Sequence, residues 1–273
     1  MCDLCVIQSV KEKMLSRRDL FRSSAVIAAA GVAATAGLAP PAMAAGHDKV
    51  EDMTYDYDEQ FPTYFGEPGV SIEQKFKFSE HGFNLMNLTL NEHTGTHLDA
   101  PLHFSADGQA VNEIPVENLV VPLCVIDIRE TAARDDDAEV TPGDVKAWIS
   151  KNGPIPDNAC VAMLSGWGQH VKTEKYRNAD SEGKMHFPGF HIETTQMLLE
   201  ETKAVGMAVD TLSLDHGISA DFKTHYAWLP TNRWGIENIA NLESVPEAGA
   251  TLVVGAPKHK GGTGGPARIF AMV

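Results

Sequence analysis

Short apolar runs, each bounded by proline, glycine or charged residues, recur along the chain. Residues 83–90 alternate apolar and polar side chains, which is the period of a strand with one covered face. Residues 120–128 form a continuous β-branched run, which predicts a strand buried on both faces. Similar runs predict the remaining strands, at 160–164, 204–209, 250–255 and 267–272.

Three further segments carry helical signals. Thr141 followed by Pro142 predicts the start of a helix that runs to residue 149, because threonine caps a first turn and proline suits its first position. Residues 192–202 place apolar side chains on one side of a helix, and residues 233–242 are predicted as another short helix. Strands and helices are interspersed along one domain, which indicates an α/β or α+β fold with a mixed sheet.

The N-terminal segment differs from the rest of the chain. Residues 16–22 contain paired arginines, residues 26–39 are mostly Ala, Gly and Val, and residues 42–44 read Ala-Met-Ala. This order predicts a secretory signal peptide, and the paired arginines favour the twin-arginine route. The alternative is a membrane anchor, but a spanning helix needs about 20 strongly apolar residues. We therefore expect a signal peptide over residues 1–44, a mature domain over 45–273, and a periplasmic or secreted protein.

Composition and charge exclude several classes of protein. The 273 residues carry a formal net charge of −15 at pH 7, so binding to nucleic acid or to an anionic membrane is not expected to be the main function. Four cysteines are too few for a disulfide scaffold, and Cys124 and Cys160 lie in apolar runs, so we expect buried free thiols. The acidic and polar residues 46–60 are expected to form a loose lead-in.

The segment that carries chemistry is His-Thr-Gly-Thr-His-Leu-Asp-Ala-Pro-Leu-His, residues 93–103. His93, His97, Asp99 and His103 all occupy odd positions, so an extended chain would place the four side chains on one face. Imidazoles and a carboxylate that converge in this way form a site for a first-row metal. A helix would also bring the first two histidines together, but the intervening glycine, threonines and following proline oppose a helix.

This segment resembles the HxGTHxDxPxH motif of the bacterial cyclase family, which consists of metal-dependent hydrolases and includes kynurenine formamidase and isatin hydrolase. Six further segments resemble family motifs in the same order along the chain. Residues 52–54 with 62–66 resemble the "DLS" opening, 164–167 resemble "TGW", and 187–189 resemble "YPG". Residues 209–215 resemble "VDTxSxD", 225 with 235–238 resemble a late His with "ENL", and 255–257 with 264–268 resemble the closing "GxP…GxPxR".

The resemblance implies a swivelling β/β/α domain that assembles as a homodimer or homotetramer. It implies that His93, His97 and Asp99 bind metal, and that His225 and Glu237 complete the site in members with two metals. The last histidine of the motif, His103, corresponds to the proton-transfer residue of the family.

These assignments predict a hydrolase in which a metal-activated water attacks the carbonyl of an aryl formamide or cyclic amide, with His103 as general base and then general acid. The donor set suits one or two Zn²⁺ or Mn²⁺ ions without choosing between them. Tyr64, Phe65 and Trp167 either stack on an aromatic substrate or pack in the core. The alternatives are a lactam or lactone hydrolase, or a periplasmic metal- or ligand-binding protein without catalysis, which would not need His103.

Overall fold

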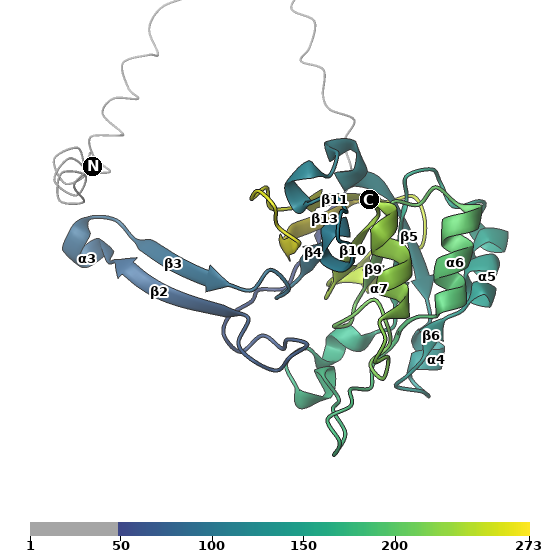
Figure 1. The fold of residues 1–273 in the computed structure, drawn as a ribbon, viewed down its shortest axis with the longest axis horizontal. Helices are drawn as coiled ribbons and strands as arrows, with labels where there is room; N and C mark the ends of the chain where they lie inside the picture. Colours follow the sequence, from purple (N-terminus) through teal and green to yellow (C-terminus); the bar gives the residue numbers. More distant parts are fainter. Residues whose placement is uncertain (1–48) are drawn as a thin grey trace, which may run out of the picture. The chain divides into compact units, whose positions relative to one another are not determined.

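The structure is a computed structural model that describes residues 49–273. The predicted signal peptide lies outside the described residues. Among these residues, no helix is long and apolar enough to cross a membrane. The described chain consists of an arm, residues 72–89, and a body, residues 49–71 and 90–273 (Figure 1).

The body contains one nine-stranded mixed sheet, with the strand order β1-β13-β11-β5-β7-β9-β10-β4-β12. Its centre, β5-β7-β9-β10, is parallel, and the strands on both sides of this centre pair antiparallel. The predicted mixed α/β fold is therefore confirmed. The strands of this sheet are β1 (Val50–Asp52), β4 (His97–Asp99), β5 (Val120–Asp127), β7 (Cys160–Leu164), β9 (Gly206–Val209), β10 (Trp234–Glu237), β11 (Thr251–Gly255), β12 (Gly264–Pro266) and β13 (Arg268–Met272).

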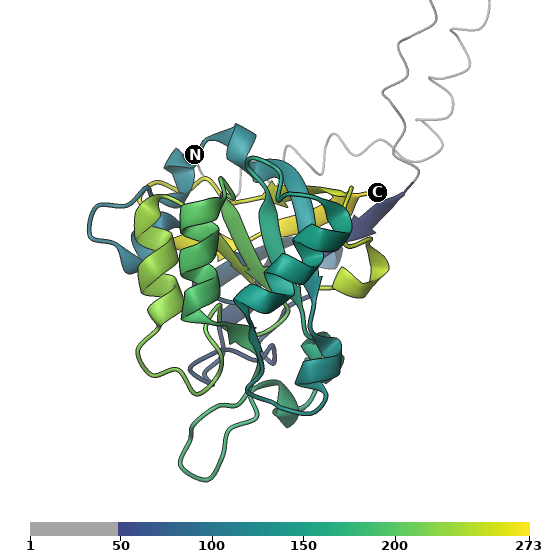
Figure 2. The same cartoon turned by 90° about the vertical axis from the view of Figure 1, so that its right-hand side faces the viewer.

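Three helices, α5 (Pro142–Asn152), α6 (Ile192–Glu201) and α7 (Lys223–Trp228), lie side by side over one face of the sheet (Figure 2). The first begins as predicted, because the Thr141 hydroxyl accepts the Asp144 N–H at 3.3 Å and the Asp144 carboxylate accepts the Thr141 N–H at 2.8 Å. Trp148 and other apolar side chains of these helices pack on alternate residues of β5, β7 and β9. The opposite residues of the same strands, including Cys160, belong to a second core. A further short helix is α4 (Arg129–Ala132). A separate small sheet joins β6 (Glu139–Val140) to β8 (Gly189–Phe190).

Two local predictions are wrong. Residues 233–242 do not form a helix, because β10 pairs with both β9 and β4 and all four of its residues are buried. Residues 46–60 are not merely a loose lead-in, since β1 pairs with β13 and Met53 is fully buried. In both segments the pairing partner is distant in sequence, and strand pairing outweighs weak local preference.

The arm is a two-stranded antiparallel ribbon of β2 (Val70–Phe76) and β3 (Leu85–Leu90), joined through the single-turn helix α3 (Phe78–His81). Its β3 strand confirms the strand predicted at 83–90, but all six of its residues are exposed, so neither face is covered. Several large apolar side chains of the arm are exposed, including Phe78, Met86 and Leu88.

Candidate metal centre and pocket

The strand register of the body brings His97, Asp99 and Glu237 together. His97 and Asp99 lie two residues apart on β4 and therefore share a face. β4 pairs antiparallel with β10, and His97 is directly opposite Glu237 in this register. Cross-strand partners have neighbouring Cβ atoms, so the Glu237 carboxylate lies beside the His97 ring. Pairing between distant segments thus assembles half of the centre.

His93 and His103 reach the centre by a different route from the predicted continuous strand. Only residues 97–99 of the motif are a strand, and the chain bends at Gly95, which has a φ of 64°. A Cβ atom on Gly95 would lie 3.0 Å from the Tyr57 ring, so glycine suits both the turn and the close approach. His103 lies on a short 3₁₀ turn, residues 101–104, which begins at a proline. The extended interpretation of the whole motif is therefore wrong, although its side chains still converge.

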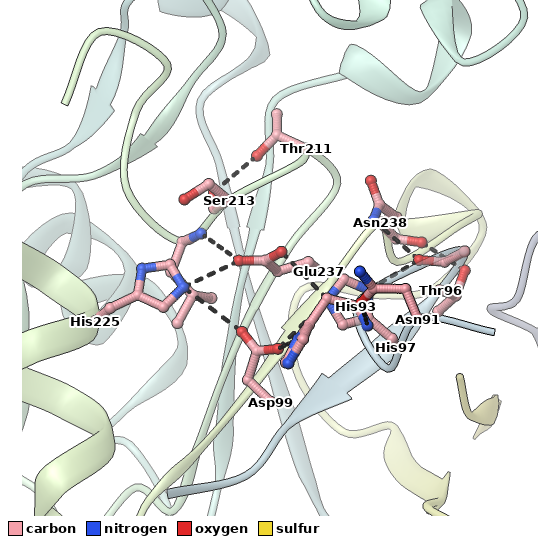
Figure 3. Close-up of polar contacts among 12 residues, drawn as sticks. Asn91, His93, Thr96, His97, Asp99, Thr211, Ser213, His225, Glu237 and Asn238 are labelled. Atoms are coloured by element: carbon pink, nitrogen blue, oxygen red, sulfur yellow. Dashed lines mark hydrogen bonds and ion pairs between the residues drawn. The ribbon is translucent and has the colours of Figure 1, made fainter. Parts of the chain in front are cut away.

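Five of the predicted site residues meet around one point (Figure 3). The Asp99 carboxylate is 2.7 Å from Nδ1 of His93, 3.3 Å from Nε2 of His97 and 3.5 Å from Nε2 of His225. The Glu237 carboxylate is 3.3 Å from Nε2 of His97 and 3.1 Å from Nε2 of His225. The two carboxylates thus lie between the three imidazoles.

The outer nitrogens of two of these imidazoles have acceptors of their own. Nδ1 of His97 is 3.0 Å from the carbonyl oxygen of Gly95. Nδ1 of His225 is 2.6 Å from the Asp215 carboxylate, which also accepts the backbone N–H of His225 at 3.2 Å. These acceptors take the N–H of the outer nitrogen, so Nε2 is the nitrogen of each ring that would offer its lone pair to a cation at the centre.

His93 is oriented by a hydrogen-bonded chain that sequence reasoning missed. Nε2 of His93 is 3.1 Å from the Thr263 hydroxyl, which donates its own proton to Glu92 at 2.5 Å. The Thr263 oxygen therefore accepts the His93 N–H at Nε2, and the 2.7 Å contact between Nδ1 and Asp99 needs a shared proton, which a bound cation would replace. Glu92 also lies 2.5 Å from Nε2 of His259. Thr263 lies in a glycine-rich segment that offers no candidate ligand, so no local signal pointed to this contact.

A centre built from lone pairs and carboxylates fits a divalent cation. Among the described residues, Nε2 of His97 and Oδ2 of Asp99 are buried without a hydrogen-bond partner. Asp99 belongs to two groups whose ligand atoms all lie within 4.8 Å of one another, one with His93 and His103 and one with His97 and Glu237. Imidazole and carboxylate ligands suit Zn²⁺ or Mn²⁺, and a shared carboxylate allows two ions.

The electrostatics of the centre favour positive charge. Although burial raises the pKa of Asp99, the neighbouring His93 and His225 hold it well below its ordinary value. Burial lowers the pKa of His97, but contacts with Asp99 and Glu237 raise it to about 10, so Nε2 carries a proton at neutral pH that a bound cation would displace. His103 differs, because burial lowers its pKa to about 4. Its ring stacks on His93 with a centroid distance of 3.8 Å. At neutral pH a neutral imidazole therefore lies beside the centre.

A cavity of about 520 Å³ opens onto this centre. The predicted residues Tyr64 and Phe65 line it, together with Phe104 and Phe222, which sequence reasoning missed. The Phe222 ring centroid is 5.6 Å from that of Tyr64 and 5.5 Å from that of Phe104. The cavity thus has an aromatic wall near its imidazoles and carboxylates, and a flat apolar ring fits such a wall.

Trp167 does not line this cavity. It is 3% exposed in a separate apolar cluster, and its indole N–H donates to the carbonyl of Tyr176 at 3.0 Å. The buried Asp210 carboxylate holds this segment, because it accepts the backbone N–H groups of Ser165, Gly166 and Trp167. Burial raises the pKa of Asp210 to about 6 against these hydrogen bonds. For Trp167 the structure therefore favours core packing over substrate contact.

Other candidate features lie away from the centre. His191 caps α6, and His216 pairs with Glu139 at 3.0 Å. Neither residue lines the cavity. A larger and more open groove of about 1080 Å³ runs past Tyr55 and Arg177, and none of the described residues that line it is a predicted metal ligand. The cavity at the imidazoles is therefore the stronger candidate site.

Comparisons with known proteins agree with this architecture. A family model described as "Putative cyclase" matches residues 51–216. Isatin hydrolase of Roseibium aggregatum is 32% identical over 228 residues, covering 78% of this chain and 86% of that protein. Kynurenine formamidase of Salinibacter ruber is 28% identical over 189 residues, covering 69% and 80%.

Among solved structures, isatin hydrolase A from Labrenzia aggregata, bound to benzyl benzoate, superimposes with a TM-score of 0.77 and 34% identity, covering 82% of this chain and 93% of that one. The resemblance seen in the motif segments is thus confirmed across most of the described chain. Sequence motifs, fold and family match together establish that this chain belongs to the cyclase family of metal-dependent hydrolases.

Proposed function

We propose that this protein is a metal-dependent hydrolase that cleaves the C–N bond of an aryl formamide or a cyclic aryl amide. The observation that carries the proposal is the cavity itself, where three inward imidazole nitrogens and two carboxylates lie near an aromatic wall. The relatives named isatin hydrolase and kynurenine formamidase support hydrolysis of an amide attached to an aromatic ring.

His93, His97, Asp99, His225 and Glu237 would hold one or two divalent ions, Zn²⁺ or Mn²⁺. A divalent metal bound there lowers the pKa of water and polarises a carbonyl.

The remaining steps belong to groups of the chain. His103 is neutral, because burial lowers its pKa to about 4, and so it can accept a proton from the attacking water. Water oxygen bonds to the carbonyl carbon, the C–N bond breaks, and His103 returns the proton to the leaving nitrogen. The aromatic wall, with Tyr64 and Phe104, orients the ring of the substrate and excludes water.

Of the two amide substrates, the cyclic one is a lactam, whose ring opens by the same bond cleavage. The similarity to isatin hydrolases, at 32% identity in sequence and a TM-score of 0.77 in structure, favours this variant. Lactone hydrolysis would need no proton on a leaving nitrogen and is the least demanding of the alternatives.

A hydrolysis panel on purified protein of measured metal content tests the proposal. The panel contains formanilide, N-formylkynurenine, isatin and dihydrocoumarin, and His97→Ala serves as the metal-site control. We expect turnover of at least one amide by the wild type and loss of that turnover in the variant. Metal binding without turnover of any compound of the panel would instead indicate a binding protein, and turnover of dihydrocoumarin alone would indicate a lactonase.

We further propose that the protein is exported by the twin-arginine route and assembles as a homodimer or homotetramer. The paired arginines and the Ala-Met-Ala site support export, and exposed apolar side chains on the arm, such as Met86 and Leu88, support an assembly that covers them. Mass spectrometry of periplasmic protein should find an N-terminus near Ala45. Light scattering of the mature protein should give a multiple of the monomer mass, and a monomer would refute the assembly.

A further inference from the structure

Phe222 has a backbone conformation that its side chain does not favour. Its φ and ψ are 47° and 45°, in the left-handed region. Six described residues other than glycine have positive φ, and the other five are asparagines, which tolerate this conformation. A bulky side chain there is a true outlier, and such outliers persist where the surrounding structure enforces them.

The enforcing contacts come from Asp215. Its Oδ1 accepts the backbone N–H of Thr224 at 2.8 Å, and its Oδ2 accepts the backbone N–H of His225 at 3.2 Å. Oδ1 also accepts the hydroxyl of Ser219 at 3.4 Å. These bonds hold the first turn of α7, so the chain must turn into the helix at Phe222.

The enforced turn places the Phe222 ring in the cavity. The half-buried ring lies 5.6 Å from Tyr64, 5.5 Å from Phe104 and 5.7 Å from the ring of His225, measured between centroids. It therefore connects the aromatic wall to an imidazole of the centre. Asparagine or glycine would suit the backbone at this position, but neither would supply this surface.

We propose that Phe222 is a specificity-determining residue, whose ring selects aromatic over saturated ring ligands at the cavity. The inference deepens the proposed function and rests on the same cavity. Aromatic contacts of this kind change affinity by about three- to tenfold beyond the buried area.

The test measures binding, so that it does not depend on turnover. Benzoate and cyclohexanecarboxylate are titrated into Zn²⁺-loaded wild type and into Phe222→Leu, which keeps an apolar side chain but removes the ring. We expect the Kd of benzoate to rise about three- to tenfold and that of cyclohexanecarboxylate to change less than about twofold. Phe222→Asn, which suits the left-handed backbone, provides a second variant. Phe78→Leu, which removes an exposed ring of the arm outside the cavity, is the matched control and should leave both Kd values unchanged.

The backbone part of the inference has its own readout. Glycine normally lowers the stability of a protein relative to alanine, but at positive φ the order reverses. We therefore expect Phe222→Gly to melt about 2–4 °C above Phe222→Ala. Three results would each overturn the inference: an equal rise in the Kd of benzoate and of cyclohexanecarboxylate in Phe222→Leu, an unchanged Kd of benzoate, or a higher Tm for Phe222→Ala than for Phe222→Gly. If no amide is hydrolysed but benzoate selectivity falls as expected, the proposed function fails while the role of Phe222 stands.

Discussion

Replacing His103 tests whether this residue transfers protons or binds metal. Its ring stacks on His93 and lies in the cavity, and its pKa is lowered to about 4, so it is a neutral base at pH 7. It is also one of three residues whose ligand atoms come within 4.8 Å of one another, with His93 and Asp99. The geometry therefore allows either role, and His103→Ala separates them.

The expected effect follows from the role of a general base. Such a group contributes about 10²–10⁴ in rate, which corresponds to roughly 3–5 kcal/mol of transition-state stabilisation. His103→Ala should lose about this factor in kcat on the best amide of the panel. Metal content should stay at the wild-type level, because His97, Asp99 and Glu237 still form a complete group of ligand atoms without it.

The assay pairs steady-state kinetics with elemental analysis of the same preparations. His170→Ala is the matched control, because this histidine lies outside the cavity, and it should leave kcat and metal content unchanged. Loss of metal in His103→Ala would make His103 a ligand. A kcat within about twofold of the wild type, far below a general-base effect, would mean that another group carries the proton.

Three further substitutions test groups that act on the centre or on its surroundings. Asp215→Asn removes the carboxylate that orients His225 and should weaken metal binding about 10–100-fold in a chelator competition. Thr263→Val removes the hydroxyl beside His93 and should weaken metal binding about tenfold in the same competition. An unchanged metal affinity would show that the hydroxyl is dispensable. For Asp210, burial raises the folded-state pKa from 3.8 to about 6, so its contribution to stability is full below about pH 4 and is lost as the pH rises through 6. Urea unfolding should therefore show that the free energy of unfolding of the wild type falls by up to about 3 kcal/mol relative to that of Asp210→Asn between about pH 4 and 7.5. A difference in unfolding free energy that stays constant over this pH range would contradict a buried carboxylate that binds a proton.

Local pattern predicted the two longest helices, α5 and α6, and the strands β3, β5, β7, β9, β11 and β13. The apolar run at 160–164 is β7, and the Thr141-Pro142 pair starts α5, because a continuous apolar run and a helix cap are both visible in neighbouring residues. The segment 233–242 was mispredicted for the opposite reason. Its residues become β10 only because β4 and β9 lie on either side of it, and neither partner is visible in the local sequence.

The metal centre was predictable only in part from its residues. Spacing alone placed His97 and Asp99 on one face, because side chains alternate along a strand. His225 and Glu237 were indicated only by resemblance to the family, since their approach depends on the register between β4 and β10 and on the start of α7.

The tertiary structure alone decided how the centre works. Asp215 and Thr263 determine which nitrogen of His225 and of His93 faces inward, because each accepts the outer N–H. The strained backbone at Phe222 likewise exists only because the start of α7 is held from elsewhere in the fold. A sequence lists donors and acceptors, but the direction in which each of them points is set by long-range packing, and that direction is what suits the site to a cation.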